Sequence, residues 1–249
     1  IFFKTFKICI GISISGYILS KNIKKNDIAD TLWGLGFLLI SIFHIDSFAH
    51  LTVKSKLILV LITLWSLRLS IYLFIRSYKK KEDIRYYNMR KSWGNKDNIY
   101  SFLKVFLLQS ILMGIISYPL SIIFVNNTKN ILSTDFIALS LFIIGFLFET
   151  IADTQLMQFK LKNENKGKIL DKGLWKYTRH PNYFGEVLIW WSFYLFAVGV
   201  DGGKISIFSP LLLTFLIIRI SGIGMIEPLL AHKGSKYNKY KLNTPIFFP

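Results

Sequence analysis

The chain has 249 residues, of which 52% are hydrophobic and 16% aromatic, and 31 Lys and Arg residues stand against 14 Asp and Glu residues. A net charge of +17 is typical of a nucleic-acid-binding protein, but such a protein is rarely this apolar, and here the aromatic residues lie in long runs. The composition therefore favours a membrane protein that binds no nucleic acid, and the single cysteine, Cys9, excludes an intrachain disulfide framework and a cysteine-rich zinc site.

Several segments are apolar enough to be predicted as transmembrane helices, since a helix needs about 20 mostly apolar residues to cross a hydrocarbon layer about 30 Å thick. The seven predicted spans are 5–20, 29–49, 57–75, 101–124, 135–158, 184–200 and 205–225. The Asp-Gly-Gly-Lys sequence at 201–204 predicts a tight hairpin between the last two. The first span could instead be a signal peptide, because Lys4 and Lys7 precede a short apolar stretch, although no convincing cleavage site follows Ser20. Since the sequence begins at Ile1 and not at a methionine, we expect the natural start to lie upstream.

The distribution of basic residues predicts the orientation of these spans. In a seven-helix topology, segments 21–30, 76–100, 160–182 and 226–249 fall on one side and hold 22 Lys and Arg residues, whereas the other side holds six. Because cytoplasmic loops are enriched in Lys and Arg, we expect the N-terminus outside, the C-terminus in the cytoplasm, and basic loops that partly face anionic lipid. The expected fold is an all-α, polytopic integral membrane protein, a seven-transmembrane-helix bundle.

Three charged residues of the fifth predicted span, Glu149, Asp153 and Lys160, have spacings of four and seven and therefore share one helical stripe. Charged residues within spans are costly and usually mark a buried site or a water-filled cavity. Two acids one turn apart repel each other unless a donor pairs with them, which favours one polar wall of a ligand cavity. The alternative is an intramembrane ion pair and a lysine that reaches the interface.

The most informative motif is residues 173–186, Gly-Leu-Trp-Lys-Tyr-Thr-Arg-His-Pro-Asn-Tyr-Phe-Gly-Glu. Pro181 disfavours helical backbone at His180 and suits the first turn of a helix, so the sixth span is predicted to begin there. The free N–H groups of that first turn would lie beside Arg179, an arrangement that binds phosphate or carboxylate. The alternative is that these polar side chains only anchor the helix at the membrane interface.

Further polar residues lie near or within the last predicted span. Arg219 lies deep in the seventh span, where its charge needs an anion, either a protein acid or a ligand phosphate. Tyr237 and Tyr240 stand among lysines in the tail and would either cap a nucleotide or lie on lipid headgroups.

In the N-terminal half, Asp30 opens the second span, where it could act only as a helix cap. Arg68 and Tyr72 lie one turn apart in the third span. The loop expected at 76–97 contains four further basic or phenolic residues, Arg85, Tyr86, Tyr87 and Arg90.

Several common motifs are missing from the sequence. No Gly-x-Gly-x-x-Gly motif follows a strand, and there is no P-loop and no Gly-x-Ser-x-Gly sequence, so a nucleotide would be held by the helical bundle itself. His44 and His50 are six residues apart, which is a poor spacing for metal ligands, and we expect no metal site.

Segment 174–186, the stripe with Asp153 and the tyrosine-rich tail resemble the steroid 5α-reductase superfamily, and segments 30–37 and 65–69 resemble its bacterial branch. The resemblance implies a seven-helix bundle, expected as a single membrane domain, 1–249, whose residues 1–125 take the acceptor or lipid and whose residues 135–249 hold the cofactor. It also implies NADPH as the cofactor. Positions matching the family's cofactor site are Asp153, Lys160, Asn182, Glu186 and Arg219, with Glu149, Tyr177, Arg179, His180, Tyr183, Tyr237 and Tyr240 as further candidates.

The implied reaction is reduction of a C=C bond conjugated to a carbonyl in a lipophilic, steroid-like or other enone substrate. In the family, a Glu–Tyr pair from the early helices polarises the carbonyl. This sequence has Asp30 where a Glu is expected and Trp65 near the position of the Tyr, so the catalytic candidates are Asp30, Arg68 and Tyr72.

A second resemblance arises from the same segment. The Arg179-His-Pro-x-Tyr-x-Gly sequence, followed later by Glu227, is similar to isoprenylcysteine carboxyl methyltransferases, which use S-adenosylmethionine. A non-catalytic lipid-binding membrane protein is a third interpretation. In each case we expect a monomer in contact with membrane lipids, in the bacterial inner (cytoplasmic) membrane, with a lipophilic small-molecule substrate for the two enzymes.

Overall fold

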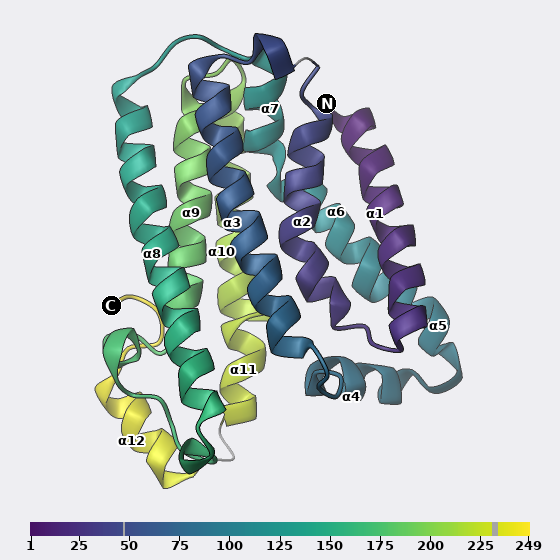
Figure 1. Ribbon diagram of the computed structural model, residues 1–249, viewed down its shortest axis with the longest axis vertical. Helices are drawn as coiled ribbons and strands as arrows, with labels where there is room; N and C mark the ends of the chain where they lie inside the picture. The colour runs from purple at the N-terminus through teal and green to yellow at the C-terminus, as the bar shows by residue number, and fades with distance from the viewer. Residues whose placement is uncertain (47, 231–233) are drawn as a thin grey trace. The chain divides into compact units, whose positions relative to one another are not determined.

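The computed structural model describes residues 1–46, 48–230 and 234–249, and within these ranges the chain forms helices and no strands (Figure 1). The α-helices are α1 (Phe2–Ile23), α2 (Ile28–Phe43), α3 (Val53–Ser77), α4 (Ile84–Trp93), α5 (Asp97–Tyr100), α6 (Leu108–Ile116), α7 (Tyr118–Asn126), α8 (Ser133–Leu161), α9 (Pro181–Val198), α10 (Phe208–Phe215), α11 (Ile223–Leu230) and α12 (Ser235–Asn243). Short π-helical segments occupy Ser101–Leu107 and Leu216–Ile220, and 3-10 turns occupy Phe48–His50, Gly94–Lys96, Asn163–Asn165, Gly173–Lys176 and Gly203–Ile207. The prediction of an all-α protein is confirmed.

Several of these helices are long and apolar enough to cross a membrane. Among the described residues there are five such segments, Phe2–Ile23, Val53–Ser77, Ile84–Ile116, Ser133–Leu161 and Gly203–Leu230. Helix α2 is apolar but has only 16 residues. Helix α9 has 18 residues, and its first turns carry the polar Asn182 and Glu186, so it is not among the five. The helices bear out the prediction of a membrane protein.

The fourth and seventh predicted spans are not continuous α-helices. Helix α6 ends at Ile116, and α7 follows with Pro119 in its first turn. Because proline lacks a backbone N–H and its ring clashes with the preceding turn, the helix breaks there. The seventh span is interrupted at Gly222, where an added Cβ would lie 2.6 Å from the carbonyl oxygen of Ile217.

Residues 84–93 form a helix, α4, where the sequence analysis expected a loop. Asp83 is its N-cap, and the Asp83 side chain accepts a hydrogen bond from the backbone N–H of Arg85 at 3.0 Å. A capped first turn satisfies a backbone donor that would otherwise lack a partner, which explains why this polar segment is helical.

The chain divides into two compact units. Unit 1 comprises residues 1–131 and 200–203, and unit 2 comprises residues 132–199 and 204–249. The single membrane domain expected from the sequence stays a prediction.

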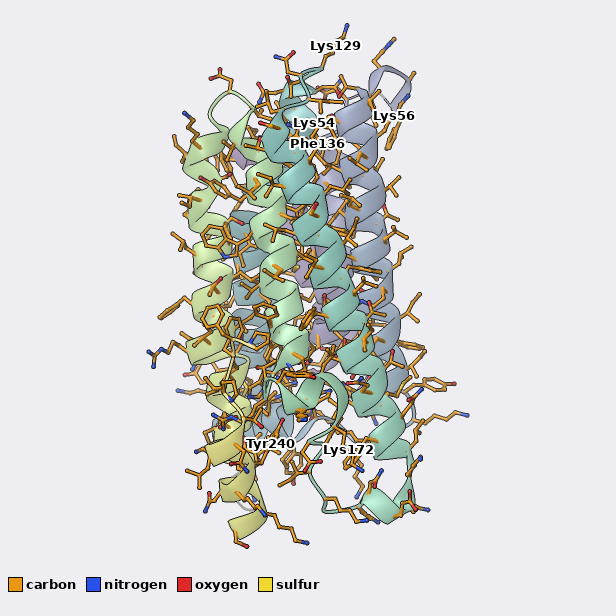
Figure 2. The ribbon with its side chains drawn as sticks, turned by 90° about the vertical axis from the view of Figure 1, so that its left-hand side faces the viewer. Lys54, Lys56, Lys129, Phe136, Lys172 and Tyr240 are labelled. Carbon is orange, nitrogen blue, oxygen red and sulfur yellow. The ribbon has the colours of Figure 1, made fainter. Side chains whose placement is uncertain are left out.

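Within unit 1, the basic segments 21–30 and 76–100 lie at the same end, as the predicted topology requires. The backbone N–H of Asn26 donates to the Glu82 carboxylate at 2.7 Å. Three lysines labelled in Figure 2 lie together at the other end of this unit: Lys54, Lys56 and Lys129.

Within unit 2, the basic segments 160–182 and 226–249 also lie together. The Tyr240 hydroxyl donates to the backbone carbonyl of Trp175. Figure 2 shows Lys172 and Tyr240 at one end of this unit and Phe136 at the other.

Two glycines set the spacing of α8 and α9, which lie side by side in unit 2 (Figure 1). A Cβ on Gly145 would lie 2.7 Å from the carbonyl oxygen of Gly185, and a Cβ on Gly185 would lie 2.5 Å from the carbonyl oxygen of Gly145. Small residues let helix backbones approach closely in membranes. The same approach brings Asp153 of α8 within reach of Asn182 of α9.

Gly145→Ala and Gly185→Ala should each lower stability by about 1–3 kcal/mol, because the added methyl group overpacks a backbone contact. Thermal unfolding of the detergent-solubilised protein measures the change. Gly11→Ala is the matched control, since a Cβ on this helical glycine of α1 meets nothing within 4 Å. Equal melting temperatures for all three variants would contradict the proposed glycine contact.

Candidate functional site

A half-buried carboxylate in unit 2, that of Glu227 in α11, has three hydrogen-bonded partners. The Arg179 Nη1 atom donates to its Oε2 at 2.6 Å, and the Tyr237 hydroxyl donates to its Oε1 at 2.6 Å. The His180 Nε2 atom lies 2.9 Å from the same Oε1, and because a carboxylate only accepts, this nitrogen carries the proton. We call these four residues the Glu227 cluster.

The members of the Glu227 cluster are shielded from solvent. The side chains of Arg179 and His180 are 8% and 4% exposed, and that of Glu227 is 14% exposed. Burial, followed by the hydrogen bond to Glu227, raises the pKa of the Tyr237 hydroxyl, so this phenol remains a hydrogen-bond donor at physiological pH. The cluster therefore pairs one carboxylate with one guanidinium in a poorly hydrated place, where both charges need their partners.

The C-terminal tail holds the chain that enters α9. The backbone N–H of Arg179 donates to the carbonyl of Pro245 at 2.9 Å, and the Thr178 hydroxyl donates to the carbonyl of Phe247 at 2.8 Å. Pro181 lies in the first turn of α9, as predicted, and His180 has non-helical backbone angles (φ −139°, ψ 59°). These contacts hold the backbone from which the Arg179 and His180 side chains extend.

A second polar pair lies between α8 and α9. The Asn182 Nδ2 atom donates to Asp153 Oδ1 at 3.1 Å. Asp153 and Glu149 are buried, with 4% and 2% of their surface exposed, and both acids of the predicted stripe lie on the side of α8 that contacts α9. Lys160, at the far end of the stripe, is exposed.

Two buried polar atoms beside these groups have no hydrogen bond within the part of the chain that the structure describes. They are Arg179 Nε, a donor, and Asn182 Oδ1, an acceptor. Leaving a buried polar group unsatisfied costs about 1–3 kcal/mol, so a ligand that supplies both an acceptor and a donor would be stabilised here.

The remaining candidates from the sequence occupy different surroundings. Tyr183 stacks on His180, with ring centroids 5.7 Å apart, and thereby adjoins the Glu227 cluster. Glu186 is half-buried on α9, and Tyr177 is exposed. Arg219 lies in the π-helical segment Leu216–Ile220 and is exposed on unit 2. Tyr177, Lys160 and Arg219 thus take no part in the contacts to Glu227 described above.

In unit 1, Asp30 forms a second cluster with residues of α4. Its Oδ1 accepts from the Tyr86 hydroxyl at 2.5 Å, and its Oδ2 accepts from Arg85 Nη2 at 2.9 Å. The Gln109 Nε2 atom donates to the Tyr86 oxygen at 3.2 Å. Tyr86 is buried. Its hydroxyl is therefore held between an acid and an amide, and we call this group the Asp30 cluster.

Asp30 is not a helix cap, because the N-cap of α2 is Asp27 and Asp30 lies within the first turn. The tyrosine that the structure places against Asp30 is Tyr86, whereas the ring of Tyr72 lies 5.9 Å from the guanidinium carbon of Arg76. Arg68 is half-buried in α3.

Four residues of these clusters were not among the candidate site residues predicted from the sequence: Glu227, Arg85, Tyr86 and Gln109. Glu227 could have been identified from the sequence, since an acid that precedes a proline at the end of an apolar span needs a partner. Tyr86 was placed in a loop, and Gln109, an uncharged residue in an apolar run, offered no signal.

No group of three or more His, Cys, Asp or Glu side chains that could hold a metal ion occurs in residues 1–46, 48–230 and 234–249.

The fold and the two clusters define a helical membrane protein with half-buried carboxylates held among hydrogen-bond donors. The chain belongs to the family described as "Protein of unknown function (DUF1295)", which matches residues 16–244. An uncharacterized protein of Schizosaccharomyces pombe is 27% identical over 220 residues, which are 75% of this chain and 61% of that relative, so the chain spans about three-fifths of its length. No solved structure matches the chain significantly.

Glu227→Ala should lower stability by about 3–5 kcal/mol, because it leaves the buried Arg179 guanidinium without its carboxylate. Thermal unfolding in detergent measures the loss. Asp46→Ala is the control, since Asp46 pairs with Lys4 at 2.9 Å but its side chain is 78% exposed. Exposed pairs contribute about 0–1 kcal/mol, so similar losses in both variants would contradict a buried ion pair at Glu227.

The Asp30 cluster also generates a pH dependence through its neighbour Asp83. Burial alone would raise the pKa of Asp83, but the hydrogen bonds and charge of Arg85 outweigh it and lower the pKa below its ordinary value of 3.8. A lowered pKa stabilises the folded protein above that ordinary value, and the stabilisation is lost as the pH falls through the folded-state pKa.

Asp83→Asn should therefore cost about 1–2 kcal/mol at neutral pH and progressively less as the pH falls below about 4. Unfolding curves of both proteins across this range measure the difference. Asparagine keeps a capping oxygen for α4, so Asp83→Ala should lose about 1 kcal/mol more at every pH. A gap between wild type and Asp83→Asn that does not change with pH would contradict the role of the charge.

Proposed function

We propose that this protein is a member of the steroid 5α-reductase superfamily that uses NADPH to reduce a C=C bond conjugated to a carbonyl in a lipophilic substrate. Membership of the DUF1295 family and the motif at 174–186 support this assignment.

The observation that carries the proposal is the pairing of Asp30 with Tyr86 in the Asp30 cluster, at 2.5 Å. An acid and a phenol held together in the early helices match the acid–tyrosine pair that the resemblance implies, with Tyr86 in the place of Tyr72. In the proposed reaction, the Tyr86 hydroxyl, which donates its single proton to Asp30 in the structure, turns that proton to the substrate carbonyl and stabilises the negative charge that develops on the carbonyl oxygen. Gln109 donates to the Tyr86 oxygen and holds it in place, and Arg85 balances the charge of Asp30.

We assign nucleotide binding to unit 2. Arg179 Nε offers an unused donor and Asn182 Oδ1 an unused acceptor, which fit the phosphate, ribose and amide groups of a dinucleotide. Asp153 orients Asn182, and Tyr237 keeps Glu227 in place. When bound, NADPH supplies the hydride that adds to the β-carbon, and a proton added at the α-carbon completes the reduction.

The proposal includes the topology and location expected from the sequence. Seven spans would place the basic ends of both units in the cytoplasm, with the N-terminus outside, in the bacterial cytoplasmic membrane. Its support is that each unit gathers its two basic segments at one end.

The methyltransferase interpretation remains a second candidate because of one specific observation. Glu227 bonds to Arg179 and His180, and these are the residues that carry the similarity to isoprenylcysteine carboxyl methyltransferases. Under that alternative, S-adenosylmethionine would occupy unit 2.

Titrating the purified, detergent-solubilised protein with NADPH and with S-adenosylmethionine separates the candidates. We expect NADPH to bind, and Asn182→Ala to weaken its affinity about tenfold through lost hydrogen bonds, whereas Asn130→Ala, in an exposed loop of unit 1, should not. Binding of S-adenosylmethionine without NADPH would favour the methyltransferase, and binding of neither would favour a non-catalytic lipid-binding protein.

The catalytic assignment has its own test. Tyr86→Phe should leave NADPH affinity unchanged but slow the reduction of an apolar enone by about 10²–10³-fold, the usual effect of removing one donor to a developing oxyanion. Stopped-flow oxidation of bound NADPH measures this rate, and an unaffected rate would remove Tyr86 from the mechanism.

A further inference from the structure

A cavity of about 1020 Å³ opens in unit 2 at the end of α8. Its walls are the last turns of α8, the segment 162–173, Lys176 and helix α12. Two of its lining residues, Lys172 and Tyr240, are labelled in Figure 2 at the same end of the unit. The volume is at the upper end of that of small-molecule sites, about 300–1,000 Å³.

The charge on the cavity wall is strongly positive. Six lysines line it, against the two acids Glu164 and Asp171, and the lysines are Lys162, Lys168, Lys172, Lys176, Lys236 and Lys239. A concave surface with one sign of charge concentrates ions of the opposite sign. The lysines come from three separate segments, so the excess belongs to the cavity and not to one helix face.

The walls of the cavity are fastened to one another by hydrogen bonds. Gln155 Oε1 accepts from the backbone N–H of Leu174 at 3.1 Å, and Asn165 Nδ2 donates to the carbonyl of Phe159 at 3.0 Å. Gly173 (φ +61°) packs so closely on Gln155 that a Cβ there would collide with its amide. Both links tie the segment after α8 to α8 itself, so the lysines surround a space with defined walls.

The length of α8 allows the cavity to lie at the level of lipid headgroups. Helix α8 has 29 residues, more than the about 20 that the hydrocarbon layer requires, so its last turns can extend beyond that layer. Basic pockets at this level of membrane proteins bind anionic headgroups.

We propose that this cavity binds a phosphate-bearing anion that is larger than free phosphate. The anion is either the headgroup of an anionic lipid or a soluble organic phosphate, and the lysines recognise the charge that these share. The site does not depend on the proposed reductase activity, because Tyr240 is its only lining residue among those discussed for the nucleotide.

The test uses the whole 249-residue chain with two lysines of α12 replaced, Lys236→Gln and Lys239→Gln. The matched control replaces Lys166 and Lys241 by Gln, which removes the same charge from neighbouring residues outside the cavity lining. All four side chains are exposed, so both double variants should fold. Binding is measured with phosphatidylglycerol against phosphatidylcholine in nanodiscs, and with pyrophosphate by calorimetry in neutral detergent.

We expect one probe, phosphatidylglycerol or pyrophosphate, to bind the wild type and the control equally and to lose about thirtyfold in affinity in the cavity variant, since each lysine near a membrane surface contributes about fivefold. Preference for phosphatidylglycerol identifies a lipid headgroup, and binding of pyrophosphate identifies a soluble ligand. Binding of neither probe, or equal loss in the two double variants, would overturn the proposal.

Discussion

A charge buried among apolar side chains must be given partners, because an unpaired ion away from water costs several kcal/mol or more. This constraint shapes both units. Glu227 takes donors from the start of α9 and from α12, and Asp30 takes donors from α4. Each carboxylate thus joins segments that are distant in the sequence, and the rest of each polar network is built around it.

The glycine contact between α8 and α9 supplies the rigidity that such a network needs. Gly145 and Gly185 allow the backbones to touch, and the Asp153–Asn182 hydrogen bond lies along the same interface. Because both helices are held at one spacing, the beginning of α9 is fixed relative to the acids of α8. The buried atoms Arg179 Nε and Asn182 Oδ1 therefore belong to side chains that other hydrogen bonds already hold, which lowers the entropic cost of binding a ligand.

The parts of this structure that follow local rules could be predicted from the sequence. Pro181 marked the start of α9, hydropathy located the long helices, and the lysine distribution grouped the basic segments that meet in each unit. The break at Pro119 also follows from a local rule, but residues 101–124 were predicted as one continuous span because the segment is apolar. The sequence could not predict pairings between residues that are far apart in the chain. Tyr86 and Asp30 are 56 residues apart, and His180 and Glu227 are 47 residues apart. Such pairings depend on which helix faces meet, and no single-sequence pattern encodes that.

The tail contacts carry a consequence for biosynthesis. Thr178 bonds to the carbonyl of Phe247, 69 residues further along the chain, and Tyr237 completes the donors around Glu227. A ribosome releases the start of α9 long before it releases these partners. The Arg179 guanidinium and the His180 imidazole therefore lack their native acceptors during this interval, while the helices are already being inserted. Completion of the site is a late event in translation, and it couples the maturation of the polar centre to synthesis of α12 and the segment after it.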